Sequence, residues 1–281
     1  MKIRQLTARD LELYQKMQTG LDSDYMLRAF ERLATPPDHQ LFGLFIDGQL
    51  ATIAGYSVFP GGYAMLGRLR SDQRFRGRGY ATEINKFMID YIKKSPEINW
   101  VGGYTNIENI PARQILKKLD IPELQTYHSL PLVQPDLLSG TPGVVWSSIT
   151  DLAKKRRVLD FLSKDVLKIY PLECYYPFPY RKELITDEKL VDTRFYHNEN
   201  QDRWLLISDD VKGDNYAQVR YFWEDYFSQA GLFETVLADI EQSKEPRKAW
   251  FDFTPEAFEK IPNKAAFDIQ EAWILYGKFL D

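Results

Sequence analysis

Apolar residues recur along this chain in two periods, a two-residue alternation typical of half-buried strands and a three-to-four-residue spacing typical of helices. In the first half, alternating or wholly apolar segments predict strands at residues 2–7, 41–46, 49–59, 63–69, 100–105 and 125–132. Helical spacing predicts helices near residues 11–17, 25–33, 81–92 and from residue 109 onward. Gly and Pro turns at residues 47–48 and 60–62 join three of the strands, so we expect an antiparallel meander there.

The same order of elements recurs in the second half. A strand, turn and helix begin at residue 143, and the pattern then predicts strands at 194–197, 204–208, 217–223, 248–253 and 272–279, with helices at 232–240 and 255–261. Pro and Gly cluster between residues 131 and 143, which is typical of a boundary. We therefore expect an α+β fold, an α/β mixed sheet in each of two tandem domains, 1–135 and 136–281. An unrelated α+β second domain is the alternative.

A glycine-rich turn, Arg76-Gly77-Arg78-Gly79-Tyr80-Ala81, separates the strand at 63–69 from the helix at 81–92. The first amides of a helix lack intrahelical partners and carry partial positive charge, so an anion is favoured there. Gly77 and Gly79 lack a Cβ and let the backbone form a concave nest. The turn predicts a diphosphate site, and an ordinary solvated loop is the alternative.

Two motifs in order resemble the GNAT superfamily of acyl-CoA-dependent N-acyltransferases over about the first 132 residues. The first is the turn itself, in which Arg76, Gly79 and Ala81 match the family pattern of Gln or Arg, Gly, and Gly or Ala. The second begins at Asn109 and resembles the family's Asn-x-x-Ala helix. The resemblance implies a GNAT-like first domain that binds acetyl-CoA or another acyl-CoA as co-substrate, and the repeated element order predicts a degenerate GNAT-like second domain.

The resemblance also implies which residues contact the cofactor. They lie at the end of the strand, in the turn and at the second motif: Leu69, Arg70, Ser71, Arg76, Gly77, Arg78, Gly79, Tyr80, Ala81, Thr82 and Asn109. Asn109 also fits an N-cap ahead of Ile110-Pro111. At the matching place in the second half, residues 224–231 carry two acids and no Gly pair, so only the first domain is expected to bind CoA.

The sequence indicates the catalytic residues less clearly than it indicates the residues that contact the cofactor. Where the family commonly has a tyrosine that protonates the leaving thiolate, this chain has Leu116. Tyr127 and His128 are candidates to replace it, and ordinary strand positions are the alternative for both. Asp72, at the strand end, is a candidate general base, and a turn-forming Asp is equally natural there.

Composition excludes several other classes of protein. Acidic residues outnumber basic residues 40 to 36, so no overall basic field would attract nucleic acid or an anionic membrane. One cysteine, Cys174, allows no intrachain disulfide, and the three histidines are far apart in sequence, so we expect no metal site. No signal-like or membrane-spanning apolar run occurs, which predicts a cytoplasmic protein.

The sequence thus favours an N-acyltransferase, with acetyl as the expected acyl group and a small-molecule or peptide amine as acceptor. We expect no nucleic-acid or membrane partner, and a homo-oligomer is left open. The first alternative is a non-catalytic acyl-CoA-binding or regulatory module, suggested by Leu116. The second is a tandem aminoacyl or peptidyl transferase with an RNA-borne donor, against which the net acidity argues.

Overall fold

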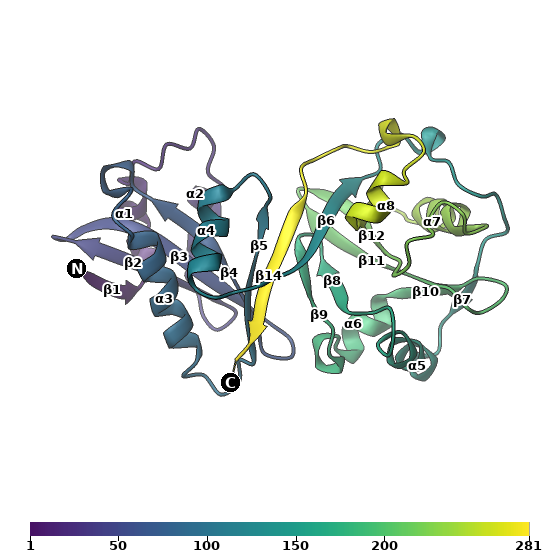
Figure 1. The fold of residues 1–281 in the computed structure, drawn as a ribbon, viewed down its shortest axis with the longest axis horizontal. Coiled ribbons are helices and arrows are strands. Elements are labelled where there is room, and N and C mark those ends of the chain that lie inside the picture. The colour runs from purple at the N-terminus through teal and green to yellow at the C-terminus, as the bar shows by residue number, and fades with distance from the viewer. Residues whose placement is uncertain (281) are drawn as a thin grey trace. The chain divides into compact units, whose positions relative to one another are not determined.

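The computed structural model describes residues 1–280, and these pack as two units (Figure 1). Unit 1 comprises Met1–Thr105, Asn109–Leu124 and the last residues of the chain from Leu275. Unit 2 comprises Asn106–Glu108 and Gln125–Ile274. The predicted boundary at residue 135 therefore differs from the division by packing, because the two units share the chain in alternating segments.

Unit 1 has a mixed sheet in the strand order β1-β2-β3-β4-β5-β14. The strands are β1 (Lys2–Gln5), β2 (His39–Ile46), β3 (Gln49–Phe59), β4 (Tyr63–Ser71), β5 (Trp100–Asn106) and β14 (Trp273–Phe279). The helices are α1 (Leu11–Gln15), α2 (Met26–Leu33), α3 (Tyr80–Ile92) and α4 (Ile110–Lys118). This is the mixed sheet with flanking helices that the sequence predicts.

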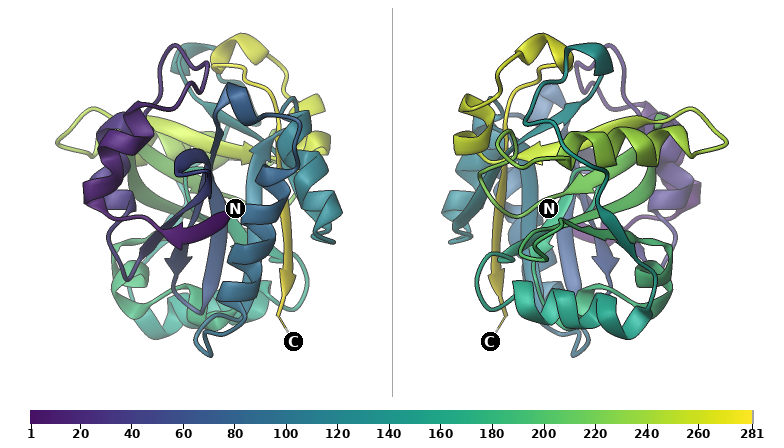
Figure 2. Two further views of the ribbon diagram at one scale, coloured as in Figure 1. Left: turned by 90° about the vertical axis from the view of Figure 1, so that its left-hand side faces the viewer. Right: turned by 90° about the vertical axis from the view of Figure 1, so that its right-hand side faces the viewer.

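Side chains of β2 pack helices onto both faces of that sheet. Leu41 is fully buried in a core with residues of α1 and α2, whereas the ring of the next residue, Phe42, contacts Phe87 and Tyr91 of α3 at centroid distances of 5.6 and 5.1 Å. Figure 2 shows α1 and α3 on opposite sides of the strands. Alternation along the strand thus places α3, and the turn before it, against one face.

Strands β4 and β5 run parallel but pair over only part of their length. Tyr63–Leu66 pair with Trp100–Gly103, and the rest of β4 pairs only with β3, across a register shift that includes Arg68 at a φ of 58°. A bulge of this kind bends one strand away from its neighbour. The two strands therefore part beyond Leu66, toward the glycine turn.

In unit 2 the strand order is β6-β13-β12-β11-β10-β7. The strands are β6 (Glu123–Pro131), β7 (Ser147–Ile149), β10 (Arg194–His197), β11 (Trp204–Lys212), β12 (Asp214–Arg220) and β13 (Lys248–Phe253). The helices are α5 (Leu152–Leu162), α6 (Asp187–Asp192), α7 (Leu232–Glu241) and α8 (Pro255–Glu259). Its largest core joins α7 and α8 to the strands, with Phe251 and Phe253 fully buried.

A separate hairpin in unit 2 was not predicted. Strands β8 (Ile169–Glu173) and β9 (Tyr176–Pro179) pair only with each other, where the sequence shows an aromatic and proline-rich segment. Cys174 sits at the turn of this hairpin, fully buried beside Tyr216 and Trp250. Proline suppresses the strand signal because it removes a backbone donor, which is tolerated here since each strand has one neighbour.

The last strand of each unit comes from an unexpected part of the chain. By sequence order, β6 would complete unit 1 and β14 would complete unit 2. Instead, His128–Pro131 of β6 pair with β13, and β14 lies next to β5. Gly102 and Gly277 leave room there for the indole of Trp100, which a Cβ at either position would meet within 2.0 Å.

Candidate functional site

The glycine turn of unit 1 adopts a left-handed conformation at both glycines. Gly77 has a φ of 77° and Gly79 a φ of 80°, and Gly79 is the N-cap of α3. A Cβ built at either position would meet nothing within 4 Å. Other residues adopt this conformation only at a cost of about 1–2 kcal/mol, so the glycines set the shape of the turn and leave its outer side open.

Five successive backbone amides are free at this turn. Thr82 N and Glu83 N both donate to Gly79 O, but within residues 1–280 the amides of Gly77, Arg78, Gly79, Tyr80 and Ala81 have no acceptor. The first turn of a helix commonly leaves such amides for water or an anion. The predicted anion site is therefore open, and it follows directly on the stretch where β4 has parted from β5.

The arginines around the turn divide into two groups. Arg70 makes two hydrogen bonds of 3.0 and 3.1 Å to Asp24, and Arg74 pairs with Asp72 at 2.7 Å. Arg76 donates to Thr19 O, and Arg78 lies over the Phe75 ring at 5.7 Å. Neither Arg76 nor Arg78 has a carboxylate partner in the described residues. These two guanidinium groups are the cations left for an anionic ligand.

Asp72 is fully buried, and both oxygens of its carboxylate accept hydrogen bonds. It accepts hydrogen bonds from Gln18 N at 3.1 Å, from Arg74 N at 2.9 Å and from the Arg74 guanidinium. These bonds, with that to the guanidinium foremost, lower the pKa of Asp72 to about 2. A carboxylate so stabilised is a weak base, so the geometry favours its role in shaping the turn over its predicted role as general base.

The second motif lies where the resemblance predicts it. Asn109 caps α4 through an Oδ1 contact of 3.3 Å to Ala112 N, which fits the N-cap reading. Leu116 is buried, and a Cβ built on Gly103 would meet its side chain at 3.3 Å. Gly103 is the last β5 residue paired with β4. Leu116 therefore projects toward the parting of the strands.

The other two predicted catalytic residues belong to unit 2 and not to unit 1. Tyr127 and His128 lie on β6, where His128 pairs with Phe253 in register and stacks on the Phe258 ring at 3.8 Å. Burial lowers the pKa of His128, and burial with the charges of Asp252 and Glu224 raises the pKa of Tyr127. The final strand of the first domain was expected to carry both residues, and the exchange of strands places them elsewhere.

The corresponding turn in unit 2 has the same backbone but is closed. Gly231 is the N-cap of α7 with a φ of 78°, and it is buried. Its amide donates to Thr141 O, and a Cβ there would lie 2.0 Å from Val144 O. The segment 141–146 thus covers the start of α7 and is fixed there by the Trp146 indole, which donates to Ala230 O at 2.9 Å. A diphosphate has no access to this helix end.

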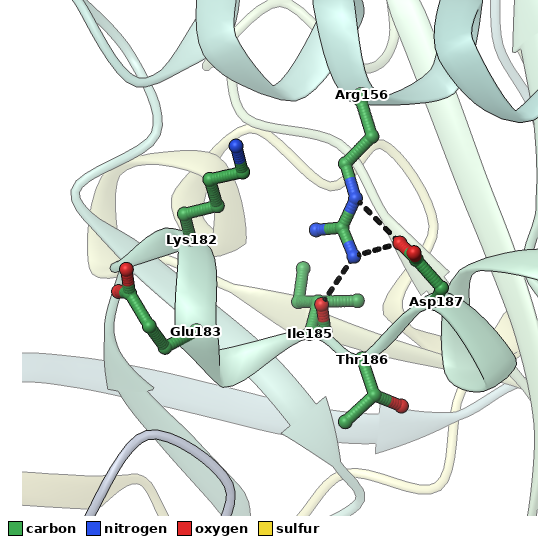
Figure 3. A pocket seen from close by; sticks show the side chains of 6 residues that line it. All are labelled: Arg156, Lys182, Glu183, Ile185, Thr186 and Asp187. Atoms are coloured by element: carbon green, nitrogen blue, oxygen red, sulfur yellow. Dashed lines mark hydrogen bonds and ion pairs between the residues drawn. The ribbon is translucent and has the colours of Figure 1, made fainter.

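Two hollows are formed entirely by unit 2. The first, of about 530 Å³, is open and lies between α5 and the start of α6. Figure 3 shows its main contact, in which Arg156 is turned to Asp187 and to Ile185 O, at 3.0 Å from Nε to Oδ1 and 2.7 Å from a terminal nitrogen to the carbonyl. This ion pair shares the surface with Lys182 and Glu183, which also line the hollow. The second hollow is smaller and lies at the parting of β12 and β13.

Metal-binding clusters and membrane-spanning helices are both absent from residues 1–280. No cluster of three or more His, Cys, Asp or Glu side chains there has the geometry to hold a metal ion. No helix in that range combines the length and apolar character needed to cross a bilayer.

A protein-family model matches the part of the chain that carries the open turn. Residues 2–121 match the acetyltransferase (GNAT) domain. The GNAT match covers under half of the chain and ends close to Leu124, where the second segment of unit 1 ends. It includes the glycine turn and the Asn109 motif. A search of curated protein sequences returned no match.

Solved structures resemble the whole chain in fold. A protein of Thermoplasma acidophilum assigned as an acetyltransferase is similar with a TM-score of 0.58 at 12% identity, over 100% of both chains. A GCN5-related N-acetyltransferase from Sphaerobacter thermophilus has a TM-score of 0.55 at 13% identity, over 99% of this chain and 95% of that one. At such identities the likeness concerns the fold, and it extends beyond the part that the GNAT model covers.

Proposed function

We propose that this protein is an N-acyltransferase that moves an acyl group, with acetyl as the expected group, from acyl-CoA to a primary amine. The observation that carries the proposal is the row of five free amides from Gly77 to Ala81, at the N-terminus of α3 and beside the parted strands. The amides and the guanidinium groups of Arg76 and Arg78 fit the CoA diphosphate. The GNAT match over the same residues supports this reading.

The chemistry needs orientation more than a special side chain. The amine nitrogen attacks the thioester carbonyl, the C–S bond breaks, and the amine proton leaves to solvent or to a base. Backbone amides at Leu69–Ser71 are the proposed donors to the oxyanion, and one such donor contributes about 10²–10³ in rate. A thiolate with a pKa of roughly 8.5 leaves without strong acid help, so Leu116 is compatible with turnover.

We further propose that unit 2 is a second, degenerate GNAT-like domain. Three features support this proposal. The strand order includes one parallel pair, formed by β12 and β13. Gly231 is left-handed at the start of α7, and solved structures resemble the whole chain in fold. Because residues 141–146 cover the start of α7, one CoA site per chain is expected.

A non-catalytic acyl-CoA-binding module is the second candidate. Leu116 at the place of the family tyrosine and the occupied carboxylate of Asp72 favour it, since neither supplies a proton-transfer group. Binding and turnover separate the two. Acetyl-CoA should raise the melting temperature in both cases, whereas only the enzyme should release free CoA thiol with a panel of amines. Failure to bind CoA or acetyl-CoA would exclude both candidates.

The turn itself is tested by Gly79→Leu. The side chain enters the open space over the free amides, so CoA affinity should fall at least about tenfold, which corresponds to about 1.4 kcal/mol. Gly213→Leu is the matched control, because Gly213 has a φ of 84° and equally open surroundings but lies in the β11–β12 turn of unit 2. Unchanged CoA affinity of Gly79→Leu would refute the phosphate site.

A further inference from the structure

The smaller hollow of unit 2 is a cavity of about 150 Å³. It begins where the parallel pairing of β12 and β13 ends, after Val219 and Phe251, so that Arg220 and Asp252 reach its wall. Tyr127 of β6 and the segment 221–226 form much of the rest. The cavity occupies in unit 2 the place that the parted β4 and β5 have in unit 1.

Two charged residues in the cavity wall, Arg220 and Asp252, are connected by hydrogen bonds through Gln218. Arg220 is 2% exposed, and its three guanidinium nitrogens donate to Pro171 O, Leu172 O, Ser208 and Gln218. Gln218 in turn donates to Asp252, which also accepts from Ser129 at 2.6 Å and from the Trp250 indole at 3.1 Å. Arg220 therefore has no donor to spare, and its charge balances that of Asp252.

Two polar groups at the cavity, the Tyr127 hydroxyl and the Glu224 carboxylate, can still form hydrogen bonds to a ligand. Tyr127 is 8% exposed, and in residues 1–280 its hydroxyl has no hydrogen-bond partner. Glu224 accepts from Thr254 through Oε2 at 2.6 Å, and Oε1 has no side-chain donor among the described residues. Burial raises the pKa of Tyr127, so the hydroxyl stays protonated. The Tyr127 hydroxyl opens into the cavity, so it and the free carboxylate oxygen of Glu224 are both available to a ligand.

The surroundings limit what that ligand can be. The phosphate end is closed by residues 141–146, so a nucleotide or CoA does not fit. A cavity of about 150 Å³ is large enough for a benzene ring. Trp223 and Tyr226 line it and offer aromatic rings, which attract cations. Lys168 also lines it, but it is exposed, and water and salt screen its charge.

We propose that this cavity is a binding site for a small molecule that presents a primary ammonium group to Glu224 and Tyr127. An ammonium group has three donors and no acceptor, so one N–H meets the free carboxylate oxygen and another meets the lone pairs of the hydroxyl. The aromatic rings pack against the remainder of the molecule. The site is separate from the acyl-CoA turn, and its ligand is held without covalent change.

The test is calorimetric titration of the full chain with benzylammonium. Benzyl alcohol and benzoate are matched probes of nearly the same size, one neutral and one anionic. Benzylammonium should bind at least about tenfold more tightly than benzyl alcohol, because a hydrogen bond to a charged group exceeds a neutral one by that order. Equal binding of the two, or no measurable binding of benzylammonium, would overturn the proposal.

Variants locate the binding within the molecule. Glu224→Gln keeps the acceptor for Thr254 but removes the charge and should weaken benzylammonium binding about tenfold. Tyr127→Phe keeps the ring and should weaken it about threefold or more. Glu241→Gln, at an exposed acid of α7 outside the cavity, should change nothing. Unaltered affinity in both cavity variants would overturn the site.

The acyl-CoA proposal is kept distinct by one further titration. Gly79→Leu should lose CoA affinity yet bind benzylammonium as the unmodified protein does. Loss of benzylammonium binding in that variant, with its melting temperature unchanged, would contradict a separate site in unit 2.

Discussion

Gly79, Gly213 and Gly231 have nearly the same backbone conformation but very different surroundings. All three have a φ between 78° and 84°. The Cβ position is open at Gly79 and at Gly213, whereas at Gly231 it lies 2.0 Å from the carbonyl oxygen of Val144. The conformation explains why each is glycine, and the surroundings decide what a substitution does to the fold.

Alanine at these three positions should therefore separate strain from steric conflict. Gly79→Ala and Gly213→Ala should lower the free energy of unfolding by about 1–2 kcal/mol each, the cost of a left-handed residue. Gly231→Ala should lower it by more than about 3 kcal/mol, since the segment 141–146 must also move. Urea denaturation followed by circular dichroism measures the series. Equal losses at all three positions would contradict the close packing of that segment.

Asp72 allows a prediction about pH. Its folded pKa of about 2 lies below the ordinary 3.8, so its contribution to stability is present above pH 3.8 and is lost as the pH falls toward 2. Asp72→Asn should destabilise the protein by about 1–2 kcal/mol at neutral pH, a value reduced because Arg74 is partly exposed. The difference between variant and unmodified protein should shrink over that acid range in urea titrations.

The same variant tests the base hypothesis. If Asp72 shapes the turn, Asp72→Asn should keep the pH profile of kcat above pH 6, apart from a uniform loss. A drop in kcat of about 10²-fold or more, with CoA affinity unchanged, would instead identify Asp72 as the general base.

At the scale of elements, α4 combines a structural and a proposed binding role at its N-cap, Asn109. Asn109→Ala removes the N-cap and should cost about 1 kcal/mol of stability, whereas Asn109→Ser restores a capping oxygen. If Asn109 also contacts CoA, the Ser variant should recover stability but not CoA affinity, as measured by thermal melting and by calorimetry. Full recovery of both would leave Asn109 as a cap alone.

Element positions were largely predictable from the sequence because their signals are local. The observed β3 (Gln49–Phe59), β10 (Arg194–His197) and β13 (Lys248–Phe253) have the predicted bounds. Apolar alternation and terminating turns determine such segments. The β8–β9 hairpin was missed because its prolines mask the strand pattern, and the bulge at Arg68 was missed because it depends on pairing with β3.

In the candidate site, too, the sequence predicted local features but not contacts between distant residues. The turn at Gly77 and Gly79 has a local signature, so its free amides followed from sequence. The bonds from Arg70 to Asp24 and from the Gln18 amide to Asp72 did not, because these pairs are 46 and 54 residues apart in the chain. The cavity beside Tyr127 also required the structure, since it is lined by four separate stretches of unit 2.

At the scale of the whole molecule, the exchange of β6 and β14 is the feature that sequence order hid. A segment's pattern shows that it is a strand, but not which sheet it joins. Tyr276 illustrates the outcome, because its hydroxyl donates to Glu123 at 2.7 Å and accepts from Arg113 at 3.2 Å, both within unit 1. Lys278 likewise donates to Leu119 O at 3.2 Å.

The exchange predicts how fragments behave. Residues 1–135 alone should fail to fold stably or bind CoA, because β5 lacks the neighbour that covers Trp100. Residues 1–124 joined by a flexible linker to residues 272–281 should recover folding, judged by cooperative urea unfolding, and should bind CoA. Cooperative folding of 1–135 with CoA affinity equal to that of the full chain would contradict the strand assignment.

The position of β14 also affects how the protein is made. A ribosome synthesises the glycine turn early, but the strand that completes the sheet around Trp100 emerges only after all of unit 2 has been translated. A nascent chain stalled or truncated within unit 2 would carry every proposed cofactor residue and still lack a finished sheet to hold them. On the proposed function, acyl-CoA binding would then begin only once β14 has been made, so chains that lack it would not compete for the co-substrate.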